Sequence, residues 1–180
     1  MQLNHLYKTR AYLVGQMQYC DGQPWREKAE KELKKLGVIV FNPYNHPFVG
    51  SSQENSSVRE KVLALAAQDL YDEATEIVNK VRREDLRMVD ICDFIFCYIN
   101  PAFPTCGTWE ELFWANRLKK PIFLCIEGGK EKCPFWMYGV MPHKYIYSSV
   151  EEALKVIHKI DSGKKPLDSD RWRLLRKEYR

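Results

Sequence analysis

The stretch Phe94-Ile95-Phe96-Cys97-Tyr98-Ile99 decides the fold, because it is apolar or aromatic throughout and carries no charge. A strand with one solvated face alternates apolar and polar residues, whereas a central parallel strand is covered on both faces and reads as a continuous apolar run. Residues 94–99 are therefore predicted to form a central parallel strand. Parallel strands need helices over both faces of their sheet, so this one stretch already indicates an α/β protein.

Strand and helix patterns alternate on both sides of this stretch, as parallel connections require. The predicted strands are 11–14, 38–41, 94–99, 121–126 and the short segment 145–147. The predicted helices are 25–36 with Pro24 at the first helical position, 58–89 with a break near 70–72, 108–118, and 150–160 capped by Ser148 or Ser149. The order predicts a flavodoxin/Rossmann-like three-layer sandwich with a mostly parallel five-stranded sheet.

The composition indicates one globular domain. The chain has 180 residues, of which 45% are hydrophobic, enough to bury one core without disulfides or metal. We expect the domain to span residues 1–162 and a basic C-terminal tail to span 163–180. The formal charge of +4 is too mild to imply nucleic-acid binding. The tail is interpreted as a solvated face or frayed end, with a remote alternative of nucleic-acid binding through Arg171, Arg173, Arg176 and Lys177.

Targeting and metal-binding patterns are missing from the sequence. The first ten residues lack the basic-then-apolar pattern of a signal peptide, and no apolar run approaches the roughly 20 residues that cross a bilayer, so we expect a cytoplasmic protein. Cys92, Cys97 and Cys125 lie in or beside apolar runs, as buried free thiols do. There is no C-x-x-C pair and the four histidines do not repeat at ligand spacing, so we expect neither a metal nor a cofactor.

Three loops are candidates for ligand binding, because ligands of such sheets bind outside the carboxyl ends of the strands. These loops are 15–23, 42–57 and 100–107. The third leads into Gly107-Thr108-Trp109-Glu110-Glu111, where a glycine turn into a helix would present free N–H groups and place Glu111 in the first turn. A carboxylate there has an ordinary alternative explanation, because helix dipoles and capping boxes also favour acidic residues in first turns.

Five short segments of the chain resemble the nucleoside 2-deoxyribosyltransferase family. They are Arg10–Val14 with Gly15, Arg83-Glu84-Asp85-Leu86, Asp90-Ile91-Cys92-Asp93, Gly107-Thr108-x-x-Glu111-x-x-x-Ala115, and Lys120-Pro121. The resemblance covers about residues 10–160. It implies an enzyme of nucleotide salvage that cleaves the N-glycosidic bond of a 2′-deoxynucleoside, or of its 5′-monophosphate, and transfers the sugar to another purine or pyrimidine base.

The same resemblance assigns roles to two carboxyl groups. It implies that Glu111 is the nucleophile that forms a glycosyl-enzyme ester, and that Asp85 is the acid/base partner that protonates the departing base. This chemistry needs one ionised carboxylate and one proton donor, which in retaining glycosidic reactions lie roughly 5 Å apart. From the residues alone, Asp85 is equally well explained as a solvated charge near the end of a charged helix.

The predicted substrate-binding residues lie in the three loops or in the strand and helices that flank them. They are Tyr12, Gly15, Gln16, Tyr19, Arg26, Asn42, Thr105, Gly107 and Thr108. Tyr12 has a core position as its alternative, and Arg26 either binds a 5′-phosphate through its planar fork or lies on the surface. Trp109 and Trp114 either stack on a base or serve as core or subunit contacts. Family members complete each pocket with a neighbouring subunit, so the resemblance implies a homo-oligomer, with residues 133–138 as a subunit contact or lid.

Two positions depart from the family pattern. Many members have Asp where this chain has Thr105, and a small residue where it has Phe113, which is expected to narrow or reshape the site. The departures favour keeping two alternatives beside the transferase. One is an N-glycosidase that uses water as the acceptor, and the other is a catalytically silent nucleotide-binding protein.

Overall fold

The predicted central strand lies at the centre of a five-stranded sheet. The computed structural model describes residues 4–17, 22–44 and 56–165, and its sheet has the order β2-β1-β3-β4-β5 with every pairing parallel. The strands are β1 (Arg10–Gly15), β2 (Ile39–Phe41), β3 (Phe94–Ile99), β4 (Ile122–Ile126) and β5 (Ile146–Tyr147). All side chains of β3 are buried except that of Tyr98, which is half-buried, because helices cover both faces. The predicted three-layer α/β sandwich is confirmed.

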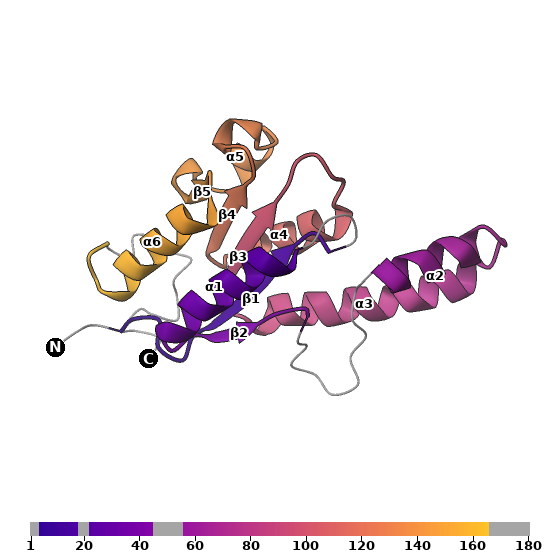
Figure 1. Cartoon of the computed structure of the whole chain (residues 1–180), viewed down its shortest axis with the longest axis horizontal. Helices are drawn as coiled ribbons and strands as arrows, with labels where there is room; N and C mark the ends of the chain where they lie inside the picture. The colour runs from indigo at the N-terminus through magenta and orange to yellow at the C-terminus, as the bar shows by residue number, and fades with distance from the viewer. Residues whose placement is uncertain (1–3, 18–21, 45–55, 166–180) are drawn as a thin grey trace.

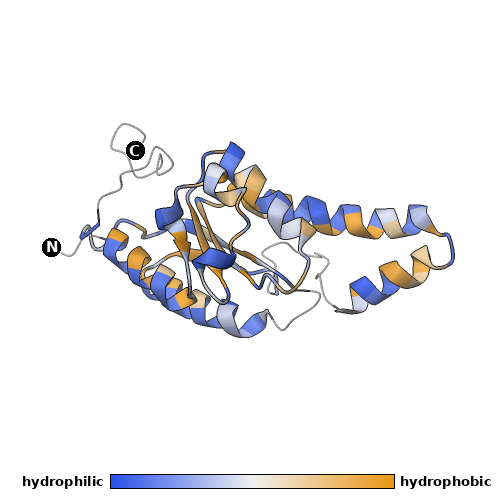
Figure 2. Cartoon of the chain, turned by 90° about the horizontal axis from the view of Figure 1, so that it is seen from above, coloured by the Kyte–Doolittle hydropathy of each residue, from blue (hydrophilic) through white to orange (hydrophobic). Residues whose placement is uncertain are grey.

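Helices form the two outer layers, α1 and α6 on one face of the sheet and α3 and α4 on the other (Figure 1). The bounds are α1 (Gln23–Lys35), α2 (Ser56–Ala66), α3 (Tyr71–Ile91), α4 (Cys106–Arg117), α5 (Met137–Val140) and α6 (Val150–Asp161). Short 3₁₀ turns at Lys130–Lys132 and His143–Tyr145 flank α5. Apolar residues gather on the strands and on the sides of α1 and α6 that face the sheet (Figure 2). The other long helices also expose apolar side chains, among them Leu63 on α2, Val78 on α3 and Phe113 on α4.

The side chain that caps α6 is Ser149 rather than Ser148. Its Oγ accepts a hydrogen bond from Glu152 N at 3.1 Å, and Glu152 Oε2 accepts one from Ser148 N at 2.9 Å. This reciprocal pair satisfies two backbone donors at the helix start and fixes where α6 begins. The helix then buries the side chains that face the sheet, Val150, Ala153, Leu154, Ile157 and Ile160.

The long helical segment predicted at 58–89 is broken where the sequence suggested, between α2 and α3. Together α2 and the first half of α3 form a hairpin that projects away from the sheet (Figure 1). The second half of α3 returns to the sheet and buries Met88 and Val89. Asp85 lies on this returning half, so the packing of α3 brings its carboxyl group to the sheet rather than leaving it out on the projecting hairpin.

Three helix starts differ from the prediction. α2 begins at Ser56, two residues earlier than predicted. Pro24 is the second residue of α1, because Gln23 already belongs to the helix. α4 begins at Cys106, two residues earlier than predicted, after an extended Thr105 (φ −150°). Gly107 is therefore inside the helix and not in a turn before it, and it has no positive φ. The glycine is not required there by backbone conformation.

The expectations about membrane helices and metal groups are checked on the described residues, and those about Tyr19 and the basic tail fall outside them. Among the described helices none is both long and apolar enough to cross a membrane, and the described His, Cys, Asp and Glu residues form no metal-binding group. Tyr19 and residues 166–180, which hold most of the basic tail, fall outside the described ranges. Near the domain end, Asp161 accepts hydrogen bonds from the backbone of His5 and Leu6. The division at residue 162 stays a prediction.

Candidate active site

A cleft of about 230 Å³ lies at the carboxyl ends of β1 and β3. These two strands are neighbours, but β1 continues into α1 on one face of the sheet and β3 into α4 on the other. The chain therefore diverges between them, which is where open α/β sheets bind ligands. The residues that line the cleft are Tyr12, Gly15, Gln16, Met17, Pro43, Asp85, Pro104, Thr105, Cys106, Gly107, Thr108 and Glu111.

Most of the residues expected at the site come together in this cleft. Of the eleven, eight line it, namely Glu111, Asp85, Tyr12, Gly15, Gln16, Thr105, Gly107 and Thr108. Four further lining residues were not predicted, namely Met17, Pro43, Pro104 and Cys106. Each of these four is adjacent in the chain to a predicted site residue. The prediction therefore identified the correct loops but did not include every residue of them that lines the cleft.

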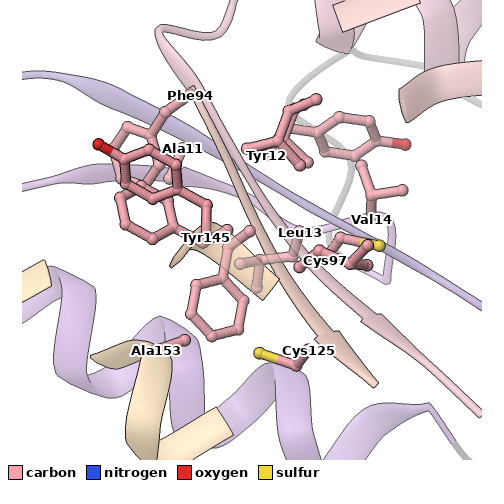
Figure 3. Close-up of a cluster of buried hydrophobic side chains, with 14 of the residues drawn as sticks. Ala11, Tyr12, Leu13, Val14, Phe94, Cys97, Cys125, Tyr145 and Ala153 are labelled. Carbon is pink, nitrogen blue, oxygen red and sulfur yellow. The ribbon is translucent and has the colours of Figure 1, made fainter. Parts of the chain in front are cut away.

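A single phenol joins the two carboxyl groups. Tyr12 Oη lies 2.6 Å from Glu111 Oε1 and 3.3 Å from Asp85 Oδ1. Side chains of β1 point alternately to the two faces of the sheet, so Tyr12 and Val14 project to one side and Leu13 to the other (Figure 3). This alternation directs the Tyr12 ring toward the two carboxyl groups. The two carboxyl oxygens cannot be farther apart than the sum of those distances. That limit is below the roughly 6.5–9.5 Å between the carboxyl groups of inverting glycosidases.

The phenol has only one hydrogen for these two neighbours. Burial raises the pKa of Tyr12 well above its ordinary value, and the negative charges of Glu111 and Asp85 raise it further. Tyr12 is therefore protonated near neutral pH and donates to Glu111, the nearer oxygen. Asp85 Oδ1, at 3.3 Å, is the more distant acceptor for the same hydroxyl group. One phenol hydrogen thus faces two carboxyl oxygens, which couples the hydrogen bonding of Glu111 to that of Asp85.

Glu111 is not in the first turn of its helix, contrary to expectation. Because α4 begins at Cys106, Glu111 is its sixth residue, and the first turn contains no acidic residue. A capping box therefore does not explain Glu111. Its side chain is 7% exposed and accepts a hydrogen bond from Tyr12, and a buried carboxylate is costly unless it is paired in this way.

The start of α4 forms one wall of the cleft. Cys106, Gly107 and Thr108 are its first three residues, and N–H groups at these positions have no partner within the helix. A Cβ atom built on Gly107 would meet nothing within 4 Å. The protein itself therefore leaves space beside Gly107, as expected where a ligand approaches the backbone closely.

Gln16 ties the first loop to the third. Its Nε2 donates to the carbonyl oxygens of Asn100 and Phe103, both at 2.8 Å, and its Oε1 accepts from Asn100 N at 2.8 Å. The side chain is buried, with 5% exposure. Gln16 therefore fixes the two walls of the cleft relative to each other, in addition to lining it.

Arg26 and Asn42 do not line the cleft. A surface position for Arg26 is wrong, because its side chain is 0% exposed and donates to backbone carbonyl oxygens, among them Gly15 O at 2.6 Å. Its guanidinium is thus engaged behind Gly15 rather than presented to a phosphate in the cleft. Asn42 donates to Glu30 Oε2 at 2.7 Å and accepts from Tyr44 N, so it stabilises the end of β2.

Phe113 does not narrow the site. It is 42% exposed and stacks on Trp109, with ring centroids 6.5 Å apart, on the outer side of α4. Helical spacing explains this, because a residue two positions after Glu111 points away from the face that Glu111 shares with the sheet. Trp114 is also partly exposed, at 40%, and donates to Asp90 Oδ1, so neither Phe113 nor Trp114 stacks on a ligand in the cleft.

Comparisons with known proteins give a likeness in structure only. No protein-family model matches the chain, and no curated protein matches it in sequence. A 2-deoxyribosyltransferase from Bacillus psychrosaccharolyticus is 23% identical, covers 66% of this chain and 72% of its own, and has a TM-score of 0.45. The CMP N-glycosidase BcmB of Clostridium botulinum is 18% identical, covers 83% of this chain and 98% of its own, and has a TM-score of 0.40. At these identities the likeness is one of fold, and it assigns no role to any residue of this chain.

Proposed function

We propose that this chain is a nucleoside deoxyribosyltransferase that works through a covalent Glu111 intermediate. The observation that carries the proposal is the contact of one buried phenol with two carboxyl groups, 2.6 Å to Glu111 and 3.3 Å to Asp85. The resemblance in the Gly107-Thr108-x-x-Glu111 segment gives the class of substrate. Proximity of an ionised and a protonated carboxyl group is what glycosyl transfer with retention requires.

In the first half-reaction, a Glu111 oxygen attacks the anomeric carbon of the deoxyribosyl group. The N-glycosidic bond breaks, its electron pair leaves with the nucleobase, and Asp85 gives its proton to that base. Tyr12 holds Glu111 through the hydrogen bond at 2.6 Å, which orients the attacking carboxylate. The product is a sugar ester on Glu111 and an ionised Asp85.

In the second half-reaction, a nitrogen of another nucleobase attacks the same carbon and displaces Glu111. The proton lost by the incoming base goes to Asp85, which restores the starting state of both carboxyl groups. The same groups thus serve in both directions, as microscopic reversibility requires.

The test is chromatography of 2′-deoxynucleosides and their 5′-monophosphates, incubated with the protein and with or without a second free base. Appearance of a new nucleoside supports transfer, and intact-protein mass spectrometry after an acid quench is expected to find the added deoxyribosyl mass. Glu111→Gln should abolish both. Its matched control is Glu110→Gln, because Glu110 is the next residue but pairs with Arg82 on the exposed side of α4. Full activity in Glu111→Gln would refute the proposal.

A second candidate is an N-glycosidase for nucleoside 5′-monophosphates. Two observations favour it: Thr105 adds no negative charge to the cleft wall, and the first turn of α4 presents N–H groups beside the open space at Gly107. A helix N-terminus of this kind attracts an anion such as a phosphate. Water would then replace the second base in attacking the Glu111 ester.

The same panel separates the candidates. Free sugar 5′-phosphate and free base, with no new nucleoside when a second base is supplied, would favour the glycosidase. Binding of a nucleotide without cleavage over a long incubation would instead favour a silent binding protein. A preference for monophosphates over nucleosides in either reaction would support anion recognition at α4.

A further inference from the structure

Arg26 is a buried cation at the base of the first loop. It lies in α1, its side chain is 0% exposed, and it is the largest of the fully buried side chains described. In the described part of the chain, every hydrogen bond it donates ends on a backbone carbonyl. The acceptors are Gly15 O at 2.6 Å, Gly22 O at 2.9 Å, Gln16 O at 3.3 Å and Leu13 O at 3.5 Å. The guanidinium thus holds both ends of the loop that begins at the cleft.

The glycines at the two loop ends show how tightly the chain is built around this group. A Cβ atom on Gly22 would lie 2.3 Å from Arg26 Nη1. One on Gly15 would lie 2.5 Å from Tyr98 O and 3.4 Å from Arg26 Nη2. Both positions therefore need glycine for lack of space, and neither has a positive φ. The geometry is that of a backbone clamp.

Among the described residues, no carboxylate accepts a hydrogen bond from the Arg26 guanidinium. Aromatic rings lie near the guanidinium instead, Trp25 at 4.5 Å and Tyr44 at 5.5 Å from its central carbon, and ring faces attract cations. Burial lowers the pKa of Arg26, whereas Tyr44, Tyr12 and Glu111 raise it. An arginine stays protonated at neutral pH, so its charge acts on nearby groups of the cleft, Glu111 among them.

We propose that Arg26 is a positioning residue of the site, which clamps the backbone at Gly15 and Gln16 and supplies the buried positive charge that keeps Glu111 ionised. An effect of Arg26 on turnover rests on the proposed function. Its effect on the ionisation of Glu111 does not. Groups of the described residues that face Glu111 include Tyr12 from β1, Asp85 from α3 and Cys97 from β3. Each of these three is acidic or neutral, and the positive charge of Arg26 opposes the rise that negative neighbours cause in the pKa of Glu111.

The charge is tested by titrating Glu111 in the free protein. The ¹³C signal of its carboxyl group, assigned by its loss in Glu111→Gln, is followed against pH in the parent and in Arg26→Gln. We expect the Glu111 titration to move to higher pH in Arg26→Gln, because the cation that favours the carboxylate is gone. Arg82→Gln is the matched control, since Arg82 is exposed and pairs with Glu110, and it should leave the titration unchanged. An unmoved titration in a folded Arg26→Gln protein would overturn the proposal.

Arg26→Lys tests the clamp and remains informative if Arg26→Gln does not fold. Lysine keeps the charge but cannot span four carbonyls, so Glu111 should titrate as in the parent. Hydrogen exchange at Asn100 N, which donates to Gln16 Oε1, should become faster by about tenfold, as loss of one or two hydrogen bonds would give. Unchanged exchange, or a Glu111 titration moved to higher pH in Arg26→Lys, would contradict the proposal.

The Glu111 titration and the hydrogen exchange at Asn100 are both measured without substrate turnover. A negative result in either therefore refutes the role of Arg26 without bearing on the proposed enzyme activity. If the protein does transfer or release a base, the pH profile of kcat/KM gives a further check. The acid limb of this profile, which reports the ionisation of Glu111, should move to higher pH in Arg26→Gln. Arg26→Lys should mainly raise KM. A purely structural role would lower activity without moving the limb.

Discussion

The hydroxyl group of Tyr12 is the shared neighbour of Glu111 and Asp85, so a residue of the first strand connects side chains from two different helices. We expect Tyr12→Phe to lower kcat/KM by roughly 10- to 100-fold, the effect of losing one hydrogen bond to a charged group. The measurement is steady-state kinetics on the best substrate of the panel. A loss below twofold would show that Tyr12 does not orient Glu111.

Tyr147→Phe is the control for this variant. Tyr147 is also buried, but its hydroxyl finds no hydrogen-bond partner among the described residues and lies outside the cleft. Removing an unsatisfied buried hydroxyl group is neutral or stabilising. Activity should therefore be retained and the melting temperature should be unchanged or higher.

Asp85→Asn should impair substrates according to their leaving group. An asparagine cannot give up a proton, so bases that need protonation to depart should lose most of their rate. Bases that depart readily as anions should lose little. The check is kcat for a series of nucleosides with graded leaving-group acidity, where the variant should show the steeper dependence. Equal losses across the series would exclude Asp85 as the proton donor and leave it a purely electrostatic role.

The strands of the sheet could be predicted from the sequence because each is marked by a local run of apolar residues. The run at 94–99 and the alternation of strands and helices identify every strand of the sheet to within a residue or two, since burial on both faces selects continuous apolar segments. The loops at the carboxyl ends of the strands follow from the same topology. Most of the cleft could be predicted for that reason.

The remaining errors concern side-chain environments that only the packed chain determines. Arg26 appears in the sequence as one more charge on an amphipathic helix, and its burial results from the packing of α1 beneath the first loop. Phe113 was placed by its distance from Glu111 in the chain, but the helix turns it to the outer side. The helix start at Cys106 was missed because Gly107 was interpreted as a turn before the helix, whereas the structure has it inside α4.

Gly107→Ala should separate stability from activity. Alanine is a better helix residue, and no atom lies within 4 Å of the new Cβ, so the free energy of unfolding should rise by up to about 1 kcal/mol. The methyl group enters space beside the cleft wall, so KM should increase. Gly139→Ala in α5 is the control, since its Cβ also meets nothing within 4 Å but it lies outside the cleft lining. It should change stability without changing KM.

Cys92 should make the protein less stable at high pH. Burial raises the pKa of its thiol from 9.0 to about 12. Below pH 9 both the folded and the unfolded chain keep the proton. Between pH 9 and 12 the unfolded chain loses it while the folded chain retains it, so the free energy of unfolding falls as pH rises, by up to about 1.4 kcal/mol per pH unit for this group.

Cys92→Ala removes this dependence, so its unfolding free energy should fall less steeply above pH 9 than that of the parent. The measurement is urea denaturation in reducing buffer at pH 8, 9, 10 and 10.5. Val89→Ala is the matched control, because Val89 is also fully buried near the end of α3 but has no titratable group. Its stability should be lower than the parent's by the same amount at every pH, since a truncated apolar side chain changes packing but binds no proton. Parallel curves for all three proteins would show that the Cys92 thiol is accessible to solvent in the folded state.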